Sequence, residues 1–250
     1  MAAYDFRAIR LRVEGPLAQG ATIGCDRDQA NYLLNVMRLG DGESIAVFDG
    51  AHGEWRARLA RSGKKGLDLV VEEMLRPQPA AGDLALMFAP LKHARLDYMV
   101  QKAVEMGVTR LQPVMTRRTQ AQRVNLDRMR ANAVEAAEQC GVLTLTACDE
   151  TASLPDALAA LPKDRLLVFC DEDAAVANPA EVLAAARPVS GGITVLIGPE
   201  GGFAPEERNL VTRHPRALAL SLGPRILRAD TAAVAALALV QAVLGDWGSP

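Results

Sequence analysis

Residues 195–207 read VLIGPEGGFAPEE, and their pattern is the clearest indication of fold class in the chain. Its apolar start predicts a buried strand, its Gly and Pro residues predict a tight turn, and Pro205 followed by two acids predicts the first turn of a helix. A strand that passes through a turn into a helix is the repeating unit of α/β sheets. The turn matches neither the dinucleotide fingerprint nor the P-loop, and acids at the helix start disfavour a phosphate. Taken alone, it is either a tight connection or a site where backbone groups approach a ligand.

A second segment has the same construction and reads LSLGPRILRADT, residues 220–231. A strand again ends in Gly-Pro, and Arg225, Arg228 and Asp230 place charges beside apolar neighbours. Ligands of open α/β sheets bind beyond the carboxyl ends of the strands, so two such loops at one edge predict a pocket. The alternative is that Arg228 and Asp230 form a structural ion pair near the start of the helix.

The rest of the chain predicts two domains, divided as residues 1–75 and 76–250, because residues 76–82 have the composition of a linker. Before the linker, strands are expected at 8–13, 44–48, 54–60 and 67–72, with one amphipathic helix near 33–39. After it, strands are expected at 84–89, 110–115, 166–170, 193–197 and 217–222, and helices at 91–106, 126–140, 179–186, 205–214 and 230–244. The last helix is apolar around much of its circumference, which predicts burial in the core or against another subunit.

Composition places the chain among ordinary globular proteins, with 250 residues, 50% hydrophobic and 23% charged. No apolar stretch approaches about 18 residues and the start does not resemble a signal peptide, so we expect a soluble, cytoplasmic protein without a membrane partner. The four cysteines form no CxxC pair, which gives no support to a disulfide scaffold or a zinc ribbon. His52, His93 and His214 are dispersed, so no metal site is expected.

The net charge of −2 conceals a strong segregation along the chain. Residues 92–130 contain nine Lys and Arg against three Asp and Glu, whereas residues 131–190 contain three against ten. One face that meets a polyanion and another that faces water would explain this pattern. The alternative is that both segments are solvated helix surfaces.

Taken together, the sequence motifs resemble those of a known family. The loops 197–207 and 222–231, together with Glu138-Gln139-Cys140-Gly141 and residues 100–108, closely resemble the ribosomal RNA small subunit methyltransferase E family of the SPOUT superfamily. The resemblance extends over nearly the whole chain. It implies a PUA-like β-barrel at residues 1–75, followed at residues 76–250 by a SPOUT α/β domain with a deep trefoil knot, which is a rare exception to ordinary topology.

The resemblance also implies an activity and a cofactor. Members of this family use S-adenosylmethionine to methylate N3 of a uridine in small-subunit (16S) ribosomal RNA. The cofactor would lie between the turn after residues 166–170 and the two Gly-Pro loops, and because it has no phosphate it suits a glycine-rich, phosphate-poor pocket. The expected cofactor contacts are Ile197, Gly198, Pro199, Glu200, Gly201, Gly202, Leu222, Gly223, Ile226, Leu227 and Arg228.

Methylation of N3 requires removal of a weakly acidic imide proton, so positioning and stabilisation of the charge on the base should dominate catalysis. Arg228 is the candidate for stabilising that charge, and Asp230 or Glu200 for accepting the proton; no metal is needed. The chain departs from the family pattern at Val142, where relatives have Arg, at Tyr32, where His is common, and at Asp230, where relatives have Glu.

Expected partners follow from the same resemblance. We expect a homodimer formed beside the last helix, and 16S ribosomal RNA within the small ribosomal subunit as substrate. The predicted RNA-binding residues are Arg7, Arg10, Arg12, Lys92, Arg95, Lys102, Arg117, Arg118 and Arg123. Two alternatives remain open: a non-catalytic RNA-binding or ribosome-assembly protein, and a knotted methyltransferase that acts on another RNA.

Overall fold

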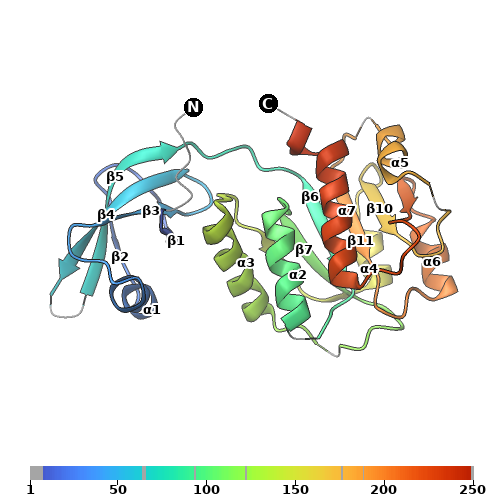
Figure 1. Cartoon of the computed structure of the whole chain (residues 1–250), viewed down its shortest axis with the longest axis horizontal. Coiled ribbons are helices and arrows are strands. Elements are labelled where there is room, and N and C mark those ends of the chain that lie inside the picture. Colours follow the sequence, from blue (N-terminus) through green and yellow to red (C-terminus); the bar gives the residue numbers. More distant parts are fainter. Residues whose placement is uncertain are drawn as a thin grey trace. The chain divides into compact units, whose positions relative to one another are not determined.

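The computed structural model describes residues 8–63, 66–92, 94–121, 123–175, 177–187 and 189–248. The chain forms two compact units (Figure 1). The first unit contains residues 1–81 and residues 137–145, and the second contains residues 82–136 and 146–250. The linker expected at 76–82 lies at this division, but the return of residues 137–145 to the first unit has no counterpart in the linear division predicted from the sequence.

A curled five-stranded sheet forms the first unit (Figure 1), with the order β1–β3–β4–β5–β2. Strand β1 (Arg10–Arg12) runs parallel to β3 (Ser44–Phe48), and the remaining pairs are antiparallel. The other strands are β2 (Thr22–Gly24), β4 (Glu54–Ser62) and β5 (Gly66–Arg76). Buried residues alternate with more exposed ones along β4 and β5, so one face of the sheet covers the core of this unit.

The single helix predicted near residues 33–39 is instead a composite. Helix α1 (Arg27–Asn31) begins at a capping box formed by Asp26 and Gln29, and a π-helical turn, η1 (Tyr32–Val36), continues it. Leu33 is fully buried in the core of the unit, which explains the apolar periodicity, while Val36 is 61% exposed.

A seven-stranded sheet whose strand pairs are all parallel among the described residues forms the second unit. Its order is β12–β10–β11–β6–β7–β8, and β9 (Ala152–Ser153) pairs with β7. The strands are β6 (Leu84–Phe88), β7 (Arg110–Met115), β8 (Ala147–Cys148), β10 (Leu166–Cys170), β11 (Ile193–Ile197) and β12 (Ala217–Leu220). Every residue of β6 and β11 is buried, because helices cover both faces of a parallel sheet.

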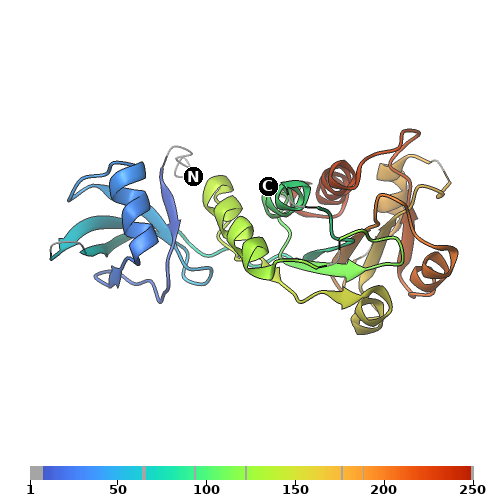
Figure 2. The ribbon, with the colours of Figure 1, turned by 90° about the horizontal axis from the view of Figure 1, so that it is seen from below.

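Figure 2 shows α2 (Ala94–Glu105) and α7 (Ala229–Val243) on one face of this sheet and α4 (Leu154–Ala160) on the other. Helix α5 (Pro179–Ala185) contacts α7, and α6 (Pro205–Val211) contacts α4. The chain also forms α3 (Leu126–Cys140) and a final 3₁₀ turn, η2 (Asp246–Gly248). None of the helices in the described residues has the length and apolar character needed to cross a bilayer.

Two of the sequence motifs end helices. Gly107 follows α2 with φ +79° and Gly141 follows α3 with φ +73°, a left-handed conformation that favours glycine at a helix end. The motif at 138–141 also secures the return of the chain to the first unit. The Glu138 carboxylate accepts a hydrogen bond from the backbone N–H of Arg12 at 2.8 Å, and the Gly141 carbonyl accepts one from the Arg76 guanidinium at 3.0 Å.

Candidate functional site

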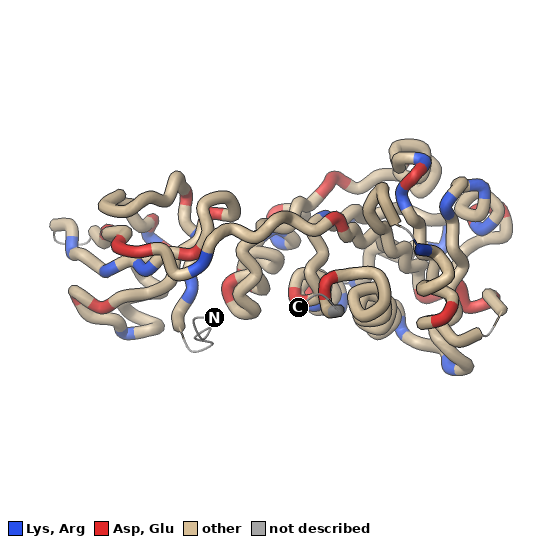
Figure 3. The backbone as a smooth tube through the Cα atoms, turned by 90° about the horizontal axis from the view of Figure 1, so that it is seen from above, with Lys and Arg blue, Asp and Glu red and all other residues tan. Residues whose placement is uncertain are grey.

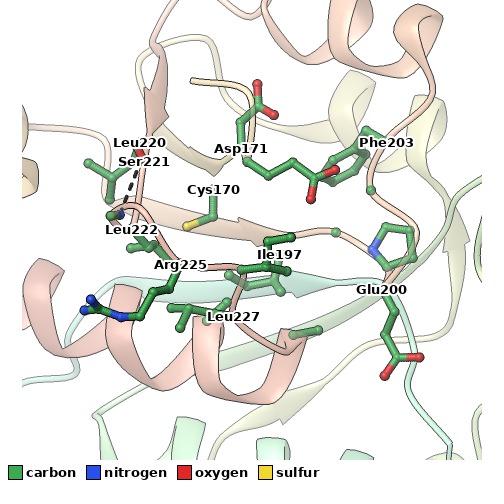
Figure 4. Close-up of a pocket in the computed structure, with 18 of the residues that line it drawn as sticks. Cys170, Asp171, Ile197, Glu200, Phe203, Leu220, Ser221, Leu222, Arg225 and Leu227 are labelled. Carbon is green, nitrogen blue, oxygen red and sulfur yellow. Dashed lines mark hydrogen bonds between the residues drawn. The ribbon is translucent and has the colours of Figure 1, made fainter. Parts of the chain in front are cut away.

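A cavity of about 270 Å³ lies at the carboxyl ends of β10, β11 and β12. Figure 4 shows Asp171 and Phe203 on one side of it and Leu222, Arg225 and Leu227 on the other. The cavity is lined by Cys170, Asp171, Glu172, Ile197, Gly198, Pro199, Glu200, Gly202, Phe203, Leu220, Ser221, Leu222, Gly223, Pro224, Arg225, Ile226, Leu227, Ala229 and Ala232. The two Gly-Pro loops therefore meet at one edge of the sheet, as their sequence construction predicts.

Glycine is required in the first loop for steric reasons. A Cβ at Gly198 would collide with the ring of Phe203, and one at Gly202, where φ is +68°, would collide with the Glu172 carboxylate. In the second loop, Gly223 has φ +100°, and no heavy atom lies within 4 Å of the position of a Cβ. The backbone at Gly223 thus faces open space in the cavity, where a ligand can approach it closely.

The polar groups of the cavity are acidic on the β10 side. Asp171 and Glu172 directly follow β10 and both line the cavity. Arg208 of α6 donates to Asp171 at 2.6 Å and also contacts Asp173, and these partners hold the pKa of Arg208 above its ordinary value. Carboxylates at this position repel phosphate and suit hydroxyl or cationic groups of a ligand.

Arg95 of α2 connects the two loops. Its Nε and Nη2 atoms each donate to Asp230 at 3.0 Å, and its Nη1 atom contacts Glu200. The hydrogen bond from Arg95 lowers the pKa of Asp230, and the same bond raises the pKa of Arg95. Asp230 therefore pairs with Arg95, not with Arg228 as the ion-pair alternative required.

Two further contacts hold the first loop and the start of α6 against the segment that follows β7. Arg118 donates from Nη1 to the Gly201 carbonyl at 2.7 Å. The buried carboxylate of Glu207 accepts the backbone N–H of Arg117 at 2.8 Å and that of Ala204 at 2.9 Å. A buried carboxylate with two backbone donors is fully satisfied, which fixes the entry into α6.

The structure brings most of the predicted cofactor contacts together. Nine of the eleven predicted residues line the cavity, and Gly201 and Arg228 do not. Among the predicted catalytic residues, Glu200 lines the cavity, Asp230 binds Arg95, and Arg228 is an exposed residue immediately before α7 whose side chain makes no capping hydrogen bond. Sequence reasoning did not identify Arg95 as the connector, because 135 residues separate it from Asp230.

The predicted RNA-binding residues are mostly paired with acids. Arg10 is buried in the first unit and donates to Glu54 at 2.9 Å, so its side chain does not reach solvent. Arg7 lies outside the described residues. Arg12 pairs with Glu14, Lys102 with Glu105 and Arg117 with Glu206, while Lys92 and Arg123 are exposed and form no ion pair within the described part of the chain. Figure 3 accordingly shows basic and acidic positions interspersed along the backbone.

The cavity contains one cysteine, Cys170. Among the described residues, no three His, Cys, Asp or Glu side chains gather in a way that would hold a metal ion. Cys170 lines the cavity, but burial raises the pKa of its thiol to about 12, which leaves almost no thiolate at neutral pH.

Comparisons with known proteins agree with this architecture. Residues 77–241 match a family model described as an RNA methyltransferase domain, and residues 25–72 match an RNA methyltransferase PUA domain. A ribosomal RNA small subunit methyltransferase E from Rickettsia conorii is 30% identical over 93% of this chain and 94% of its own length. The chain belongs to the ribosomal RNA small subunit methyltransferase E family.

Other members of the ribosomal RNA small subunit methyltransferase E family support this assignment. The Synechocystis protein is 32% identical over 95% of this chain and 78% of its own length. The crystal structure of the Neisseria gonorrhoeae protein bound to S-adenosyl methionine has a TM-score of 0.86 at 28% identity, covering 96% of this chain and all of that one. The resemblance read from the sequence is thus confirmed, as is the α/β fold with a PUA-like domain.

Proposed function

We propose that this protein transfers the methyl group of S-adenosylmethionine to N3 of a uridine in 16S ribosomal RNA. The observation that supports this most directly is the cavity at the carboxyl ends of β10, β11 and β12, which is lined by glycines and by the carboxylates of Asp171 and Glu172. Solved structures of the proteins from Neisseria gonorrhoeae and Legionella pneumophila, at 28% and 27% identity, are described as bound to this cofactor.

The residues of the cavity fit the cofactor. Asp171 and Glu172 suit its ribose hydroxyls and its cationic groups, and Ile197, Leu222 and Leu227 offer apolar surface for the adenine. Backbone groups at the glycines supply hydrogen bonds without side chains that would fill the space. When bound, S-adenosylmethionine supplies an electrophilic methyl group, and the protein must position the base and manage the N3 proton.

Glu200 is the best-placed carboxylate for that proton. It lines the cavity, and 46% of its side chain remains exposed. Asp230 is held ionised by Arg95, which makes it a weak base and gives it a positioning role. Arg228 follows Leu227, which lines the cavity, so its exposed side chain stands at the rim and can meet the RNA there.

We propose three further features of the same enzyme: a homodimer, a trefoil knot and a substrate within the small ribosomal subunit. A dimer interface would cover the half-exposed apolar side chains of α7. It would also cover Ile226 before this helix, which is 93% exposed, and Trp247 after it, which is 55% exposed. The knot is supported by the path of the chain, since β12 lies at the sheet edge while α7 contacts the central strand β11.

Mass-spectrometric mapping of 16S ribosomal RNA from cells that lack this protein tests the function. Loss of one N3-methyluridine, restored by the purified enzyme and S-adenosylmethionine, is the expected result. A complete set of modifications in those cells, with cofactor binding intact, would favour an enzyme that acts on another RNA. Absence of cofactor binding by calorimetry would favour a non-catalytic RNA-binding protein, and light scattering at micromolar concentration tests the dimer.

A further inference from the structure

A second cavity, of about 170 Å³, adjoins the first in the second unit. It is lined by Pro90, Leu91, Lys92, Arg95, Arg118, Gln120, Ala121, Pro199 and Glu200. Pro199 and Glu200 line both cavities, so they form a common wall between them. A group bound in the second cavity therefore lies next to a group bound in the first.

The topology of the sheet favours a ligand at this position. The lining segments follow the carboxyl ends of β6, β7 and β11. The chain proceeds from β6 to β7 and β8 on one side and later returns to β10, β11 and β12 on the other, so the strand order reverses beside β6. Open α/β sheets bind ligands in the crevice at such a reversal.

Two of the five polar side chains that line this cavity have no hydrogen-bond or ion-pair partner among the described residues. Within the described residues, no hydrogen bond or ion pair involves the side chain of Lys92 or Gln120. The guanidinium of Arg118 has one hydrogen bond there, to the Gly201 carbonyl, which leaves its other donors for a ligand. The one carboxylate, Glu200, contacts Arg95 and is half-exposed. Donors thus outnumber acceptors, and the site is net positive.

We propose that this second cavity receives the uracil ring that is methylated, an inference that rests on the proposed function. The edge of uracil presents the O2 and O4 acceptors on either side of the N3–H donor. Donors from Lys92, Arg118 and Gln120 around the Glu200 carboxylate form the complementary pattern. Cytosine lacks the N3 proton and has an amino group in place of O4, so the same side chains discriminate against it.

The chemical step balances with these groups. Glu200 accepts the N3 proton, and the N3 electron pair forms the new bond to the methyl carbon. The bond between that carbon and the sulfur breaks, its electron pair stays on the sulfur, and Glu200 then releases the proton to water. Arg118 and Lys92 stabilise the negative charge that spreads over O2 and O4, a role that the sequence had assigned to Arg228.

Three variants test the assignment on unmethylated small ribosomal subunits. Arg118→Ala and Lys92→Ala should each lower the single-turnover rate at saturation by about a hundredfold, and Lys92→Ala should leave the affinity for S-adenosylmethionine within about threefold. Within the described part of the chain, the Lys92 side chain forms no hydrogen bond or ion pair with the cofactor loop, so its variant separates charge stabilisation from loop support. Arg213→Ala, an exposed arginine that lines neither cavity, is the matched control and should behave as wild type.

Rescue by the conservative variant supplies a readout that a structural role would not change. Glu200→Gln should lower the single-turnover rate of methyl transfer, and Glu200→Asp, which keeps a carboxylate, should restore part of it. Wild-type rates for both Arg118→Ala and Lys92→Ala would overturn the inference while leaving the methyltransferase function standing. If the wild-type enzyme itself transfers no methyl group to the subunit, the proposed function fails first.

Discussion

Replacing Arg95 by alanine should weaken the binding of S-adenosylmethionine, because this side chain ties together the two loops that form the cofactor cavity. The two hydrogen bonds to Asp230 measure 3.0 Å each, and only 16% of the Asp230 side chain is exposed. A hydrogen bond to a charged group contributes about 1.5–3 kcal/mol when well shielded. The contact with Glu200, which is 46% exposed, contributes about 0–1 kcal/mol.

Arg95 itself is 31% exposed, so solvent screens part of this interaction and the net loss is about 1–2 kcal/mol. At about 1.4 kcal/mol for each factor of ten, the dissociation constant should rise by roughly fivefold to thirtyfold. Isothermal titration calorimetry at 25 °C measures it. Arg128→Ala is the matched control, because Arg128 forms the same two-pronged pair with Asp97 but lines neither cavity.

Two additional measurements make this prediction specific. Asp230→Asn should show a loss similar to that of Arg95→Ala, and the double variant should lose little more than either alone, because both changes break one interaction. The lowered pKa of Asp230 means that its contribution is present above about pH 4 and disappears only as the pH falls through the folded-state value. For each of these variants, the ratio of its dissociation constant to that of the wild-type protein should therefore stay constant between pH 5.5 and 8.5. An Arg95→Ala protein that binds as tightly as the Arg128→Ala control would refute the reasoning.

Other changes give equally direct tests. Glu54→Gln should destabilise the first unit by about 3–5 kcal/mol in urea unfolding, because Glu54 is buried with Arg10, and an unchanged midpoint would contradict this. Gly198→Ala should abolish cofactor binding through its collision with Phe203, and adding Phe203→Ala should restore part of it; a single variant that binds normally would show that the loop relaxes. Cys170 should resist iodoacetamide at pH 8 until the protein unfolds, since the pKa of its thiol is about 12; rapid labelling of the native protein would disagree.

The sequence predicts the second unit well because its strands are buried on both faces. The strands expected at 110–115, 166–170 and 193–197 coincide with β7, β10 and β11, since a buried parallel strand appears as an apolar run bounded by turns. Strands of two residues, such as β8 and β9, are too short to carry such a pattern. Helix α4 was also missed, although Ser153 as N-cap and a Pro in its first turn are recognisable signals.

In the candidate site too, residues within one loop could be predicted from the sequence, whereas contacts between distant segments could not. Gly198, Gly202 and Gly223 could be identified from local sequence, because Gly and Pro between a predicted strand and a predicted helix mark a tight turn. The contact of Arg95 with Asp230 could not be identified in this way, since it depends on α2 lying beside the start of α7. The composite of α1 and η1 was not predicted, because a single π-helical turn of five residues is too short to show an apolar pattern of its own.

Pairing between side chains also changes the meaning of the charge pattern. The excess of basic residues at 92–130 suggested a broad surface for a polyanion, yet Arg110 pairs with Asp149, Arg117 with Glu206 and Arg128 with Asp97. An ion pair exposed to water has little net charge left to attract a phosphate. Among the described residues, the cations without an acidic partner therefore attract a polyanion most strongly. Two of them, Lys92 and Arg118, line the second cavity. Positive charge that the composition distributes over residues 92–130 thus lies beside Glu200, the carboxylate that we propose as the proton acceptor.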